Sequence, residues 1–163
     1  MLFKPEKLKW LLKIAEDVKL ASKDQSTKIG GIIFDDNYTI LSTGYNSFPR
    51  GINDNVAARQ ERPEKYFWFE HAERNAIYNA VRAHVDIRNA NMILTCGIPC
   101  ADCGRGIIQA GIKNLICQPG TGDSVSKEGA KLKWNESCDR SEIMLRESGV
   151  DIFYIDDILK NEY

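Results

Sequence analysis

Two short motifs carry side chains that can bind a metal ion and move protons. The first is His71 with Glu73, at the point where an aromatic run gives way to a helical pattern. Residues two apart on a continuous helix point in different directions, so both side chains can face one point only if His71 stands at the helix start. The second motif is Cys100 with Cys103, directly after Pro99.

The cysteine pair has the spacing of metal ligands at the start of a helix. Proline favours the first helical turn, and residues three apart share one helix face, so both thiols emerge together. The helix dipole there favours thiolate, the form that binds metal. The same spacing also suits a redox couple or two buried side chains. With His71, Cys100 and Cys103 offer the nitrogen and sulfur ligands that zinc prefers, and three protein ligands leave a fourth position for water.

The other cysteines and the second histidine do not offer an obvious fourth ligand. Cys96, Cys117 and Cys138 lie in or near apolar segments, where a buried thiol is the simpler interpretation, and His84 lies at a helix end. The odd number of cysteines, 5, argues against a disulfide framework. Glu73 either complements a helix dipole or, beside a zinc-bound water, acts as a proton shuttle.

The elements that position these motifs follow from hydrophobic periodicity. The sequence predicts an amphipathic helix over 5–22, a β-hairpin over 28–46 and a polar loop over 47–63. Helices and strands then alternate, with helices at 72–83, 100–110 and 135–148 and strands at 91–95, 112–117 and 151–155. Strands separated by helices imply parallel pairing. We therefore expect one α/β domain over 1–163, with a three-layer fold whose mixed five-stranded sheet has an antiparallel hairpin, then parallel strands, and helices on both faces.

Bulk properties limit the classes of partner. The 163 residues carry a net charge of -1, with 22 basic and 23 acidic side chains, so no broad basic field attracts nucleic acid. No apolar run approaches the roughly 20 residues that span a bilayer, and "MLFKPEKLKW" lacks a signal-peptide pattern. We expect a soluble cytoplasmic protein with a small-molecule substrate and neither nucleic-acid nor membrane partners.

His-x-Glu followed by Pro-Cys-x-x-Cys is a known signature of zinc nucleobase deaminases. Over residues 10 to 118 the chain resembles the cytidine and deoxycytidylate deaminase superfamily, most closely its deoxycytidylate (dCMP) branch, in "ASKDQSTKIGGIIF", "STGYNSFPRGINDN", "HAERNAI" and "PCADCGRGIIQAGIKNLI". The resemblance implies a cytidine-deaminase-like fold, zinc on His71, Cys100 and Cys103, and Glu73 as the acid/base. It also implies hydrolysis of dCMP to dUMP by a zinc-bound hydroxide, since zinc lowers the pKa of its water to about 7.

Substrate contacts are implied at several further positions. The resemblance suggests that the Ser22–Lys23 turn and Asn46 with Ser47 hold the nucleotide. Lys23 offers a partial counter-charge for a monophosphate, although a solvated lysine explains it equally well. Asn46 could bond the sugar or the base, or stabilise a turn. Trp134, ahead of the last predicted helix, is a candidate for capping the ligand pocket.

Two positions bear on specificity and control. Gly97 stands where dCMP deaminases usually carry a bulkier residue, and if it lines the pocket near the ring's C5 it could admit a 5-substituted substrate such as 5-methyl-dCMP. Larger family members are often hexamers controlled by dCTP and dTTP. The stretch "GYNSFPRGINDN" resembles the segment associated with that control, which makes Arg50 a candidate phosphate contact and Mg²⁺ a candidate companion of the nucleoside triphosphate. A long loop with proline and glycine is equally well explained without any such role. We therefore expect a homo-oligomer, a hexamer or a dimer.

Other functions share the zinc motif. A tRNA adenosine deaminase would be expected to carry a basic face, which the net charge does not favour. A cytidine or cytosine deaminase would not need a phosphate contact such as Lys23. A non-catalytic zinc or nucleotide-binding module would be indifferent to replacement of Glu73.

Overall fold

A single mixed sheet forms the centre of the computed structural model, which describes residues 3–120 and 128–160. Its strand order is β2-β1-β3-β4-β5. β1 pairs antiparallel with β2 and β3, whereas β3–β4 and β4–β5 are parallel, so the predicted α/β class and mixed five-stranded sheet are confirmed. The strands are β1 (Gly30–Phe34), β2 (Ile40–Tyr45), β3 (Asn91–Leu94), β4 (Asn114–Cys117) and β5 (Asp151–Tyr154).

The helices agree with the sequence pattern at most boundaries. Pro5 opens α1, where proline lacks only an amide hydrogen that has no intrahelical acceptor. The last long helix begins at Glu128, earlier than the predicted 135. One short helical turn within the predicted polar loop, another just after that loop and the final helix were not predicted. The helices are α1 (Pro5–Lys19), the 3-10 helix η1 (Ala57–Gln60), α2 (Lys65–Trp68), α3 (Ala72–Arg82), α4 (Ala101–Gln109), α5 (Glu128–Glu147) and α6 (Ile155–Lys160).

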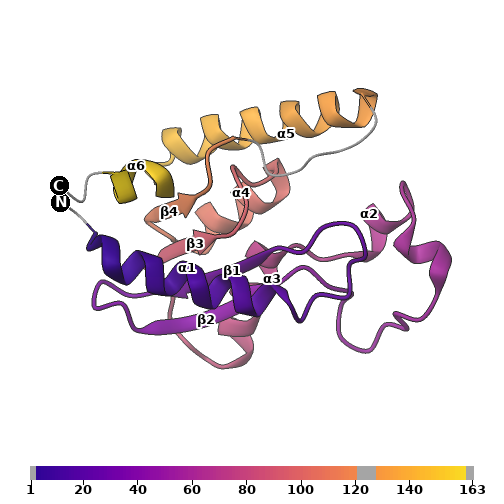
Figure 1. Ribbon diagram of the computed structural model, residues 1–163, viewed down its shortest axis with the longest axis horizontal. Coiled ribbons are helices and arrows are strands. Elements are labelled where there is room, and N and C mark those ends of the chain that lie inside the picture. The colour runs from indigo at the N-terminus through magenta and orange to yellow at the C-terminus, as the bar shows by residue number, and fades with distance from the viewer. Residues whose placement is uncertain (1–2, 121–127, 161–163) are drawn as a thin grey trace.

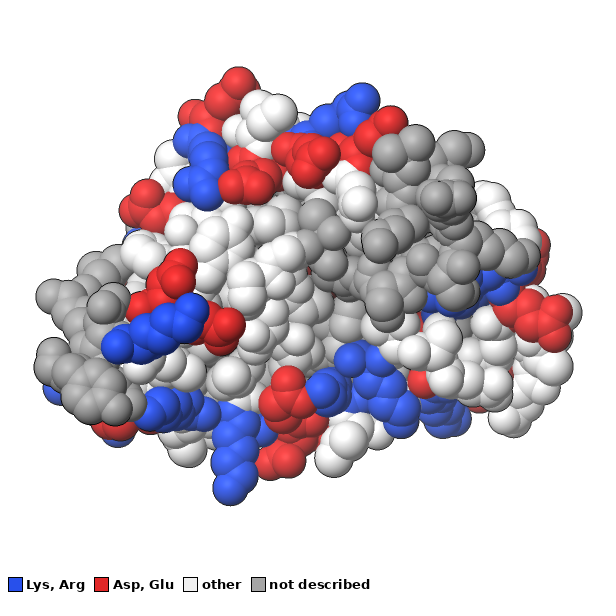
Figure 2. Space-filling view, turned by 45° about the horizontal axis from the view of Figure 1, so that its top comes forward, with Lys and Arg blue, Asp and Glu red and all other residues white. Residues whose placement is uncertain are grey.

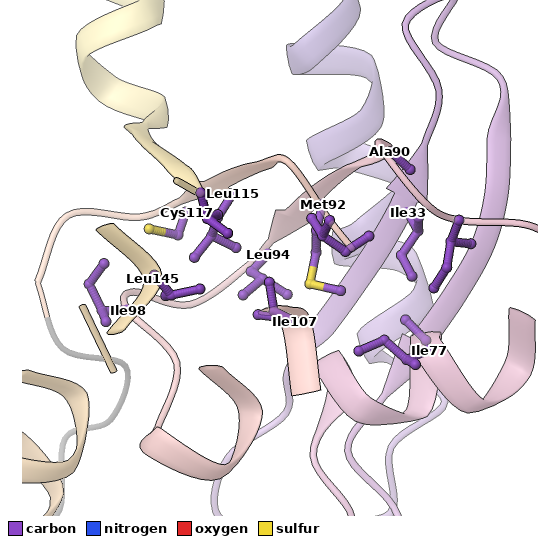
Figure 3. Close-up of a cluster of buried hydrophobic side chains, with 14 of the residues drawn as sticks. Ile33, Ile77, Ala90, Met92, Leu94, Ile98, Ile107, Leu115, Cys117 and Leu145 are labelled. Carbon is purple, nitrogen blue, oxygen red and sulfur yellow. The ribbon is translucent and has the colours of Figure 1, made fainter. Parts of the chain in front are cut away.

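Alternation along the strands divides the core into two layers. On β1, Ile32 and Phe34 face α1, whereas Ile33 faces the opposite side, as the two-residue period of a strand requires. The second side is covered by α3, α4 and α5, and Figure 1 shows α5 lying along α4. Figure 3 shows this larger cluster, in which Met92 and Leu115 are fully buried. Shortening such a side chain to alanine costs about 2–5 kcal/mol. Among the described residues, no helix is long and apolar enough to cross a membrane.

The sheet and α3 touch backbone to backbone at Gly44. A Cβ placed on this glycine of β2 would collide with the Ala72 carbonyl oxygen and the Ala76 amide nitrogen. Ser42, two residues earlier on the same strand, donates a hydrogen bond to the Ala76 carbonyl oxygen at 2.7 Å. The start of α3 is therefore held against β2 with no side chain between them.

Candidate active site

The predicted metal ligands come together at the first turns of two helices. His71 is the N-cap of α3 in an extended conformation, and Cys100 is the N-cap of α4, with Cys103 in its first turn. The His71 Nδ1 atom lies 3.5 Å from the Cys100 Sγ atom and 3.3 Å from the Cys103 Sγ atom. Tetrahedral zinc with ordinary Zn–N and Zn–S bonds separates such ligand atoms by about 3.5 Å. The three side chains therefore fit a zinc ion bound through Nδ1.

The three side chains of this group shift one another's pKa in different directions. The hydrogen bond with Cys103, followed by that with His71, lowers the pKa of the Cys100 thiol to about 4, despite burial. The hydrogen bond with Cys100, followed by burial, raises the pKa of Cys103 well above its ordinary value. For His71, burial opposes the charge, but Cys100 and Glu73 outweigh it and raise the pKa to about 9. Proton release from His71 and Cys103 would therefore accompany metal binding.

Glu73 lies in the same pocket without being one of these three ligands. Its side chain is 3% exposed, and its Oε2 atom has no hydrogen-bond partner among the described residues. Burial raises the pKa of Glu73, while the charge on His71 opposes that rise. A buried carboxyl group with a raised pKa and an unpaired oxygen is suited to taking and returning a proton.

Glu70 fixes the chain just before the metal ligand. Its Oε1 atom accepts hydrogen bonds from the His71 amide at 3.0 Å and from Arg74 Nε at 2.7 Å. Its backbone pairs with that of Ser47, with the Glu70 amide donating to the Ser47 carbonyl at 2.8 Å. Glu70 thereby orients His71 from both the helix and the neighbouring loop.

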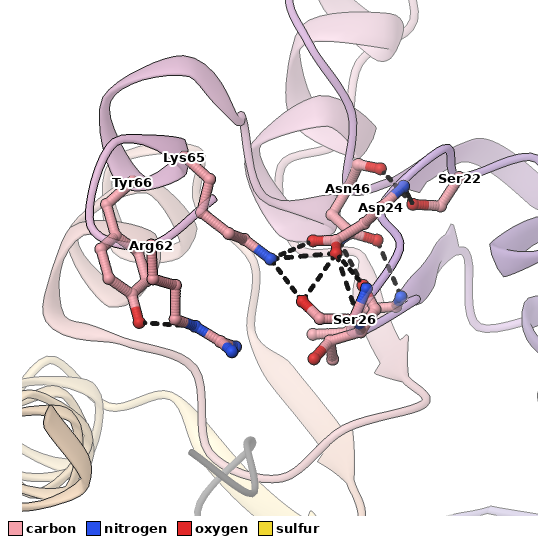
Figure 4. A network of polar contacts seen from close by, with 9 residues as sticks. Ser22, Asp24, Ser26, Asn46, Arg62, Lys65 and Tyr66 are labelled. Atoms are coloured by element: carbon pink, nitrogen blue, oxygen red, sulfur yellow. Dashed lines mark hydrogen bonds and ion pairs between the residues drawn. The ribbon is translucent and has the colours of Figure 1, made fainter. Parts of the chain in front are cut away.

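The pocket around His71 and Glu73 has a polar wall built on a buried ion pair. Lys65 Nζ donates to both carboxylate oxygens of Asp24, at 2.9 and 2.7 Å, and to Ser26 Oγ at 2.7 Å (Figure 4). Arg62 extends beside this pair, and its Nε atom donates to the Tyr66 hydroxyl at 3.0 Å. The cavity of about 50 Å³ is lined by Asp24, Thr27, Ile29, Asn46, Arg62, Lys65, Tyr66, Phe69, His71, Glu73, Cys96, Ile98, Pro99 and Trp134.

Two of the predicted substrate contacts stabilise this wall. Asn46 Oδ1 accepts from the Ile29 amide at 2.8 Å, and Asn46 Nδ2 donates to the Thr27 carbonyl and to Asp24. Ser22 is 2% exposed and donates through Oγ to the Asn46 carbonyl at 2.7 Å. Asn46 lines the pocket, whereas Ser22 supports it from behind.

Three further predicted contacts lie around a second, larger cavity. Lys23, Ser47 and Arg50 line a space of about 440 Å³ that does not contain the His71 group. Lys23 forms an exposed ion pair with Asp54 at 2.6 Å. Arg50 Nη2 donates to Asn79 Oδ1 at 2.5 Å. The nucleotide contacts expected from sequence are thus divided between two sites.

Residues 5–118 match the family model for the cytidine and deoxycytidylate deaminase zinc-binding region. The chain belongs to this family. An uncharacterized deaminase from the luxG 3′ region of Aliivibrio fischeri is 36% identical over 156 residues, covering 93% of this chain and 98% of that protein.

Deoxycytidylate deaminases are among the proteins similar to this deaminase. The human enzyme is 36% identical over 100 residues, which cover 58% of this chain and 54% of the human protein. The match thus spans about half the length of that relative. The apo crystal structure of dCMP deaminase from cyanophage S-TIM5 has a TM-score of 0.68 and 26% identity, covering 93% of this chain and 99% of that one. The predicted cytidine-deaminase-like fold is confirmed.

The remaining predicted positions of the deaminase, Trp134 and Gly97, differ in their relation to the pocket around His71. Trp134, on α5, lines the catalytic pocket, and its ring centroid lies 5.9 Å from that of His71. Gly97 is buried between the pocket-lining Cys96 and Ile98, but it is not among the described lining residues. Burial raises the pKa of the Cys96 thiol well above its ordinary value, so Cys96 is a neutral part of the wall.

Sequence reasoning missed the side chains that form the polar wall. Arg62 lies near the end of a loop without periodicity, and Lys65 follows that loop. Asp24 is adjacent to Lys23, the residue that was predicted to contact the phosphate. One available signal was the isolated lysine in the aromatic run before His71, because a lysine in such a setting needs a buried partner.

Proposed function

We propose that this protein hydrolyses dCMP to dUMP and ammonia. The observation that carries the proposal is the buried Glu73 carboxyl group, with an unpaired oxygen, beside a His71, Cys100 and Cys103 group of zinc-binding geometry. Bound zinc supplies the activated water that this hydrolysis requires. Support for the nucleotide substrate comes from the resemblance to deoxycytidylate deaminases and from the cationic side chains of the pocket.

Glu73 handles the protons of the reaction. Its carboxylate takes a proton from the attacking water and delivers it to N3 of the pyrimidine, which makes C4 more electrophilic. It then transfers a second proton from the added oxygen to the amino group, and the C4–N bond breaks to release ammonia. Because Glu73 is enclosed, the protons pass between it and the substrate rather than to bulk water.

The 5′-phosphate is proposed to lie at the polar wall. Lys65 is neutralised by Asp24, and Arg62 adds a further cation at the same pocket. A guanidinium group suits a phosphate because it donates two parallel hydrogen bonds. Lys23, the candidate from sequence, lies at the other cavity. Gly97 is not among the described residues of the pocket wall, so dCMP is proposed in preference to a 5-substituted nucleotide.

Ammonia release from dCMP, 5-methyl-dCMP, CMP, deoxycytidine and cytosine tests this function. We expect dCMP to be the best substrate and Glu73→Gln to lose most of its turnover while retaining zinc. A zinc-loaded protein that releases no ammonia from any of the five would contradict the proposal. Preference for 5-methyl-dCMP would instead show that the base pocket is wider than proposed.

The larger cavity is proposed to hold a regulatory nucleoside triphosphate with Mg²⁺. Lys23 and Arg50 supply cations for phosphates, and Asp54 and Glu70 supply carboxylates at the same cavity. Measuring dCMP turnover against dCTP and dTTP, with and without Mg²⁺, tests this site. A response to neither nucleotide would contradict it.

We also propose that the protein is a cytoplasmic homo-oligomer, either a hexamer or a dimer. Tyr78 and Val81 expose apolar surface on α3. No disulfide joins any of the five cysteines, all of which lie in the described part of the chain, and this fits a reducing compartment. Figure 2 shows acidic and basic side chains interspersed over one face, which fits a small-molecule substrate better than nucleic acid. Light scattering after size-exclusion chromatography tests the assembly, and a monomer would contradict it.

A further inference from the structure

Helix α5 lies beyond the part of the chain that matches the family model, yet it packs against the metal-binding helix. Ser137 Oγ accepts a hydrogen bond at 3.0 Å from the amide of Ala101, the first residue of α4. One turn further along α5, Ser141 lies against Gly104, where an added Cβ would collide with the serine hydroxyl. These contacts fix the position of α5 relative to the two cysteine ligands.

Trp134 lies on the same face of α5, three residues before Ser137 and seven before Ser141. Its ring lies 5.9 Å from the His71 ring, centroid to centroid, with the planes at 52°. The indole therefore borders the metal end of the catalytic pocket, and it also packs against the core cluster beneath.

The indole N–H is a buried donor with no acceptor. Four buried side-chain atoms among the described residues have no hydrogen-bond partner, and two of them belong to residues that line this one pocket: Glu73 Oε2 and Trp134 Nε1. Burying a polar group without a partner is costly, so such atoms mark positions where a ligand completes the hydrogen bonding. The proposed reaction explains the oxygen of Glu73 but leaves the nitrogen of Trp134 unexplained.

We propose that Trp134 is a specificity-determining residue whose Nε1–H donates a hydrogen bond to the C2 carbonyl oxygen of the pyrimidine. This inference rests on the proposed deamination of a pyrimidine nucleotide. The attacked carbon, C4, must lie beside the metal group, so the part of the substrate nearest His71 is the base rather than the phosphate. Cytosine offers two ring-edge acceptors, N3 and the C2 oxygen, and N3 is the atom that Glu73 protonates. The C2 oxygen is therefore the acceptor left for Trp134.

Substrate and product would be held alike by this contact. The C2 carbonyl is present in both dCMP and dUMP, so the hydrogen bond binds ground state and product without favouring the chemical step. Its loss should appear in KM and in the affinity for dUMP rather than in kcat. The contact also discriminates against bases that lack an acceptor at this position, because the donor would then stay buried and unpaired.

The first test compares Trp134→Phe with Trp10→Phe in the zinc-loaded protein. Phenylalanine keeps an aromatic ring and removes only the N–H donor, and Trp10 is an exposed tryptophan on α1 that serves as a matched control. Calorimetric titration with dUMP should show binding weakened about threefold to tenfold in Trp134→Phe and unchanged in Trp10→Phe. The KM for dCMP should rise by the same factor with kcat within about twofold of the parent.

The second test changes the acceptor in both the parent and Trp134→Phe, so a general effect of the substitution on the fold cancels when the two thio penalties are compared. The parent should process 2-thio-dCMP with a raised KM, because sulfur is a weak acceptor, whereas Trp134→Phe should show a smaller penalty for the thio substitution. Fully additive effects of the two changes would overturn the contact. Equal dUMP affinities in parent and Trp134→Phe would do the same, whereas a parent that neither binds dUMP nor deaminates dCMP would refute the proposed function itself.

Discussion

The catalytic pocket and the neighbouring cavity differ in how their charges are held. In the catalytic pocket, the lysine and the aspartate are both almost fully buried, and all three Lys65 donors are occupied by Asp24 and Ser26. Around the larger cavity, the Lys23 ion pair is exposed, and the Lys23 side chain is 68% accessible to solvent. A buried ion pair keeps its geometry because either charge alone would be costly, whereas an exposed pair exchanges readily with water.

This contrast indicates different tasks for two sites that share a boundary. The rigid wall suits a reaction that needs a substrate held in one orientation, since positioning lowers the barrier. The exposed cations suit a ligand that comes and goes with its concentration. Glu70 borders the larger cavity and also bonds the amide of His71, so the two sites meet at one side chain.

The largest expected effect is on catalysis. Glu73→Gln should reduce kcat for dCMP by about 10²–10⁴-fold, because the amide cannot shuttle protons. Zinc content, measured by atomic emission, should remain at one ion per chain, since Glu73 is outside the three-ligand group. Loss of zinc together with activity would assign Glu73 to the metal instead.

The second effect is on stability. Lys65→Met should lower the free energy of unfolding by about 3–5 kcal/mol, because it leaves Asp24 buried without its partner. Lys113→Met, which breaks the exposed ion pair with Asp36, is the matched control and should cost at most about 1 kcal/mol. Urea unfolding of both variants measures the difference, and similar losses would contradict the contrast between buried and exposed pairs.

The same pair predicts a pH dependence of stability. Burial opposes the charge on Asp24, but Lys65 and the amides of Ser26 and Thr27 outweigh it and lower the pKa of the carboxyl group below its ordinary value. A lowered pKa means that the stabilisation is complete above about pH 4 and is lost as the pH falls through the folded-state value. The loss of unfolding free energy caused by Lys65→Met should therefore become smaller below about pH 4. A loss that becomes larger there would contradict this prediction.

A smaller effect is expected at the larger cavity. Arg50→Gln should raise the concentration of a regulatory triphosphate that gives a half-maximal effect about tenfold, because the substitution removes a charged hydrogen-bond donor. Turnover of dCMP without the regulator should stay unchanged. Titration of initial rates with dCTP tests this, and a fall in the unregulated rate would connect Arg50 with catalysis.

The smallest effect is expected at Gly97. Because Gly97 is not among the described lining residues, Gly97→Ala should alter the ratio of kcat/KM for dCMP and 5-methyl-dCMP by less than about twofold. Competition between the two substrates in one reaction measures that ratio directly. A large rise in discrimination would place the ring's C5 against this residue.

The fold and the metal group were predictable because both depend on local patterns. Strand alternation and helix periodicity are repeated over many residues, and His71, Cys100 and Cys103 stand at helix starts that the sequence marks by residue type. Helix α6 and the early start of α5 were missed, since polar residues near helix ends carry a weak signal. The short helix α2 lies just after a loop whose path is set by tertiary contacts such as the Lys65–Asp24 pair.

The sequence analysis assigned to one nucleotide site residues that the structure divides between two cavities, and the reason is geometric. Asn46 and Ser47 are adjacent, yet Asn46 lines the catalytic pocket and Ser47 lines the larger cavity. Successive side chains on extended backbone point to opposite sides, so neighbours in a motif need not share a ligand. Likewise, Lys23 lines the larger cavity and its neighbour Asp24 lines the catalytic pocket. The partner of Asp24 is Lys65, 41 residues away, which no local pattern could indicate.

The direct contact of β2 with α3 has a consequence for mutational tolerance. Gly44 touches no group that we assign to the reaction, yet any side chain there would push away the first turns of α3, which carry His71 and Glu73. A survey of all single substitutions should therefore find Gly44 as intolerant as the metal ligands themselves. The intolerance at this position would then reflect the close packing that positions the active site, and not a chemical role of Gly44 in the reaction.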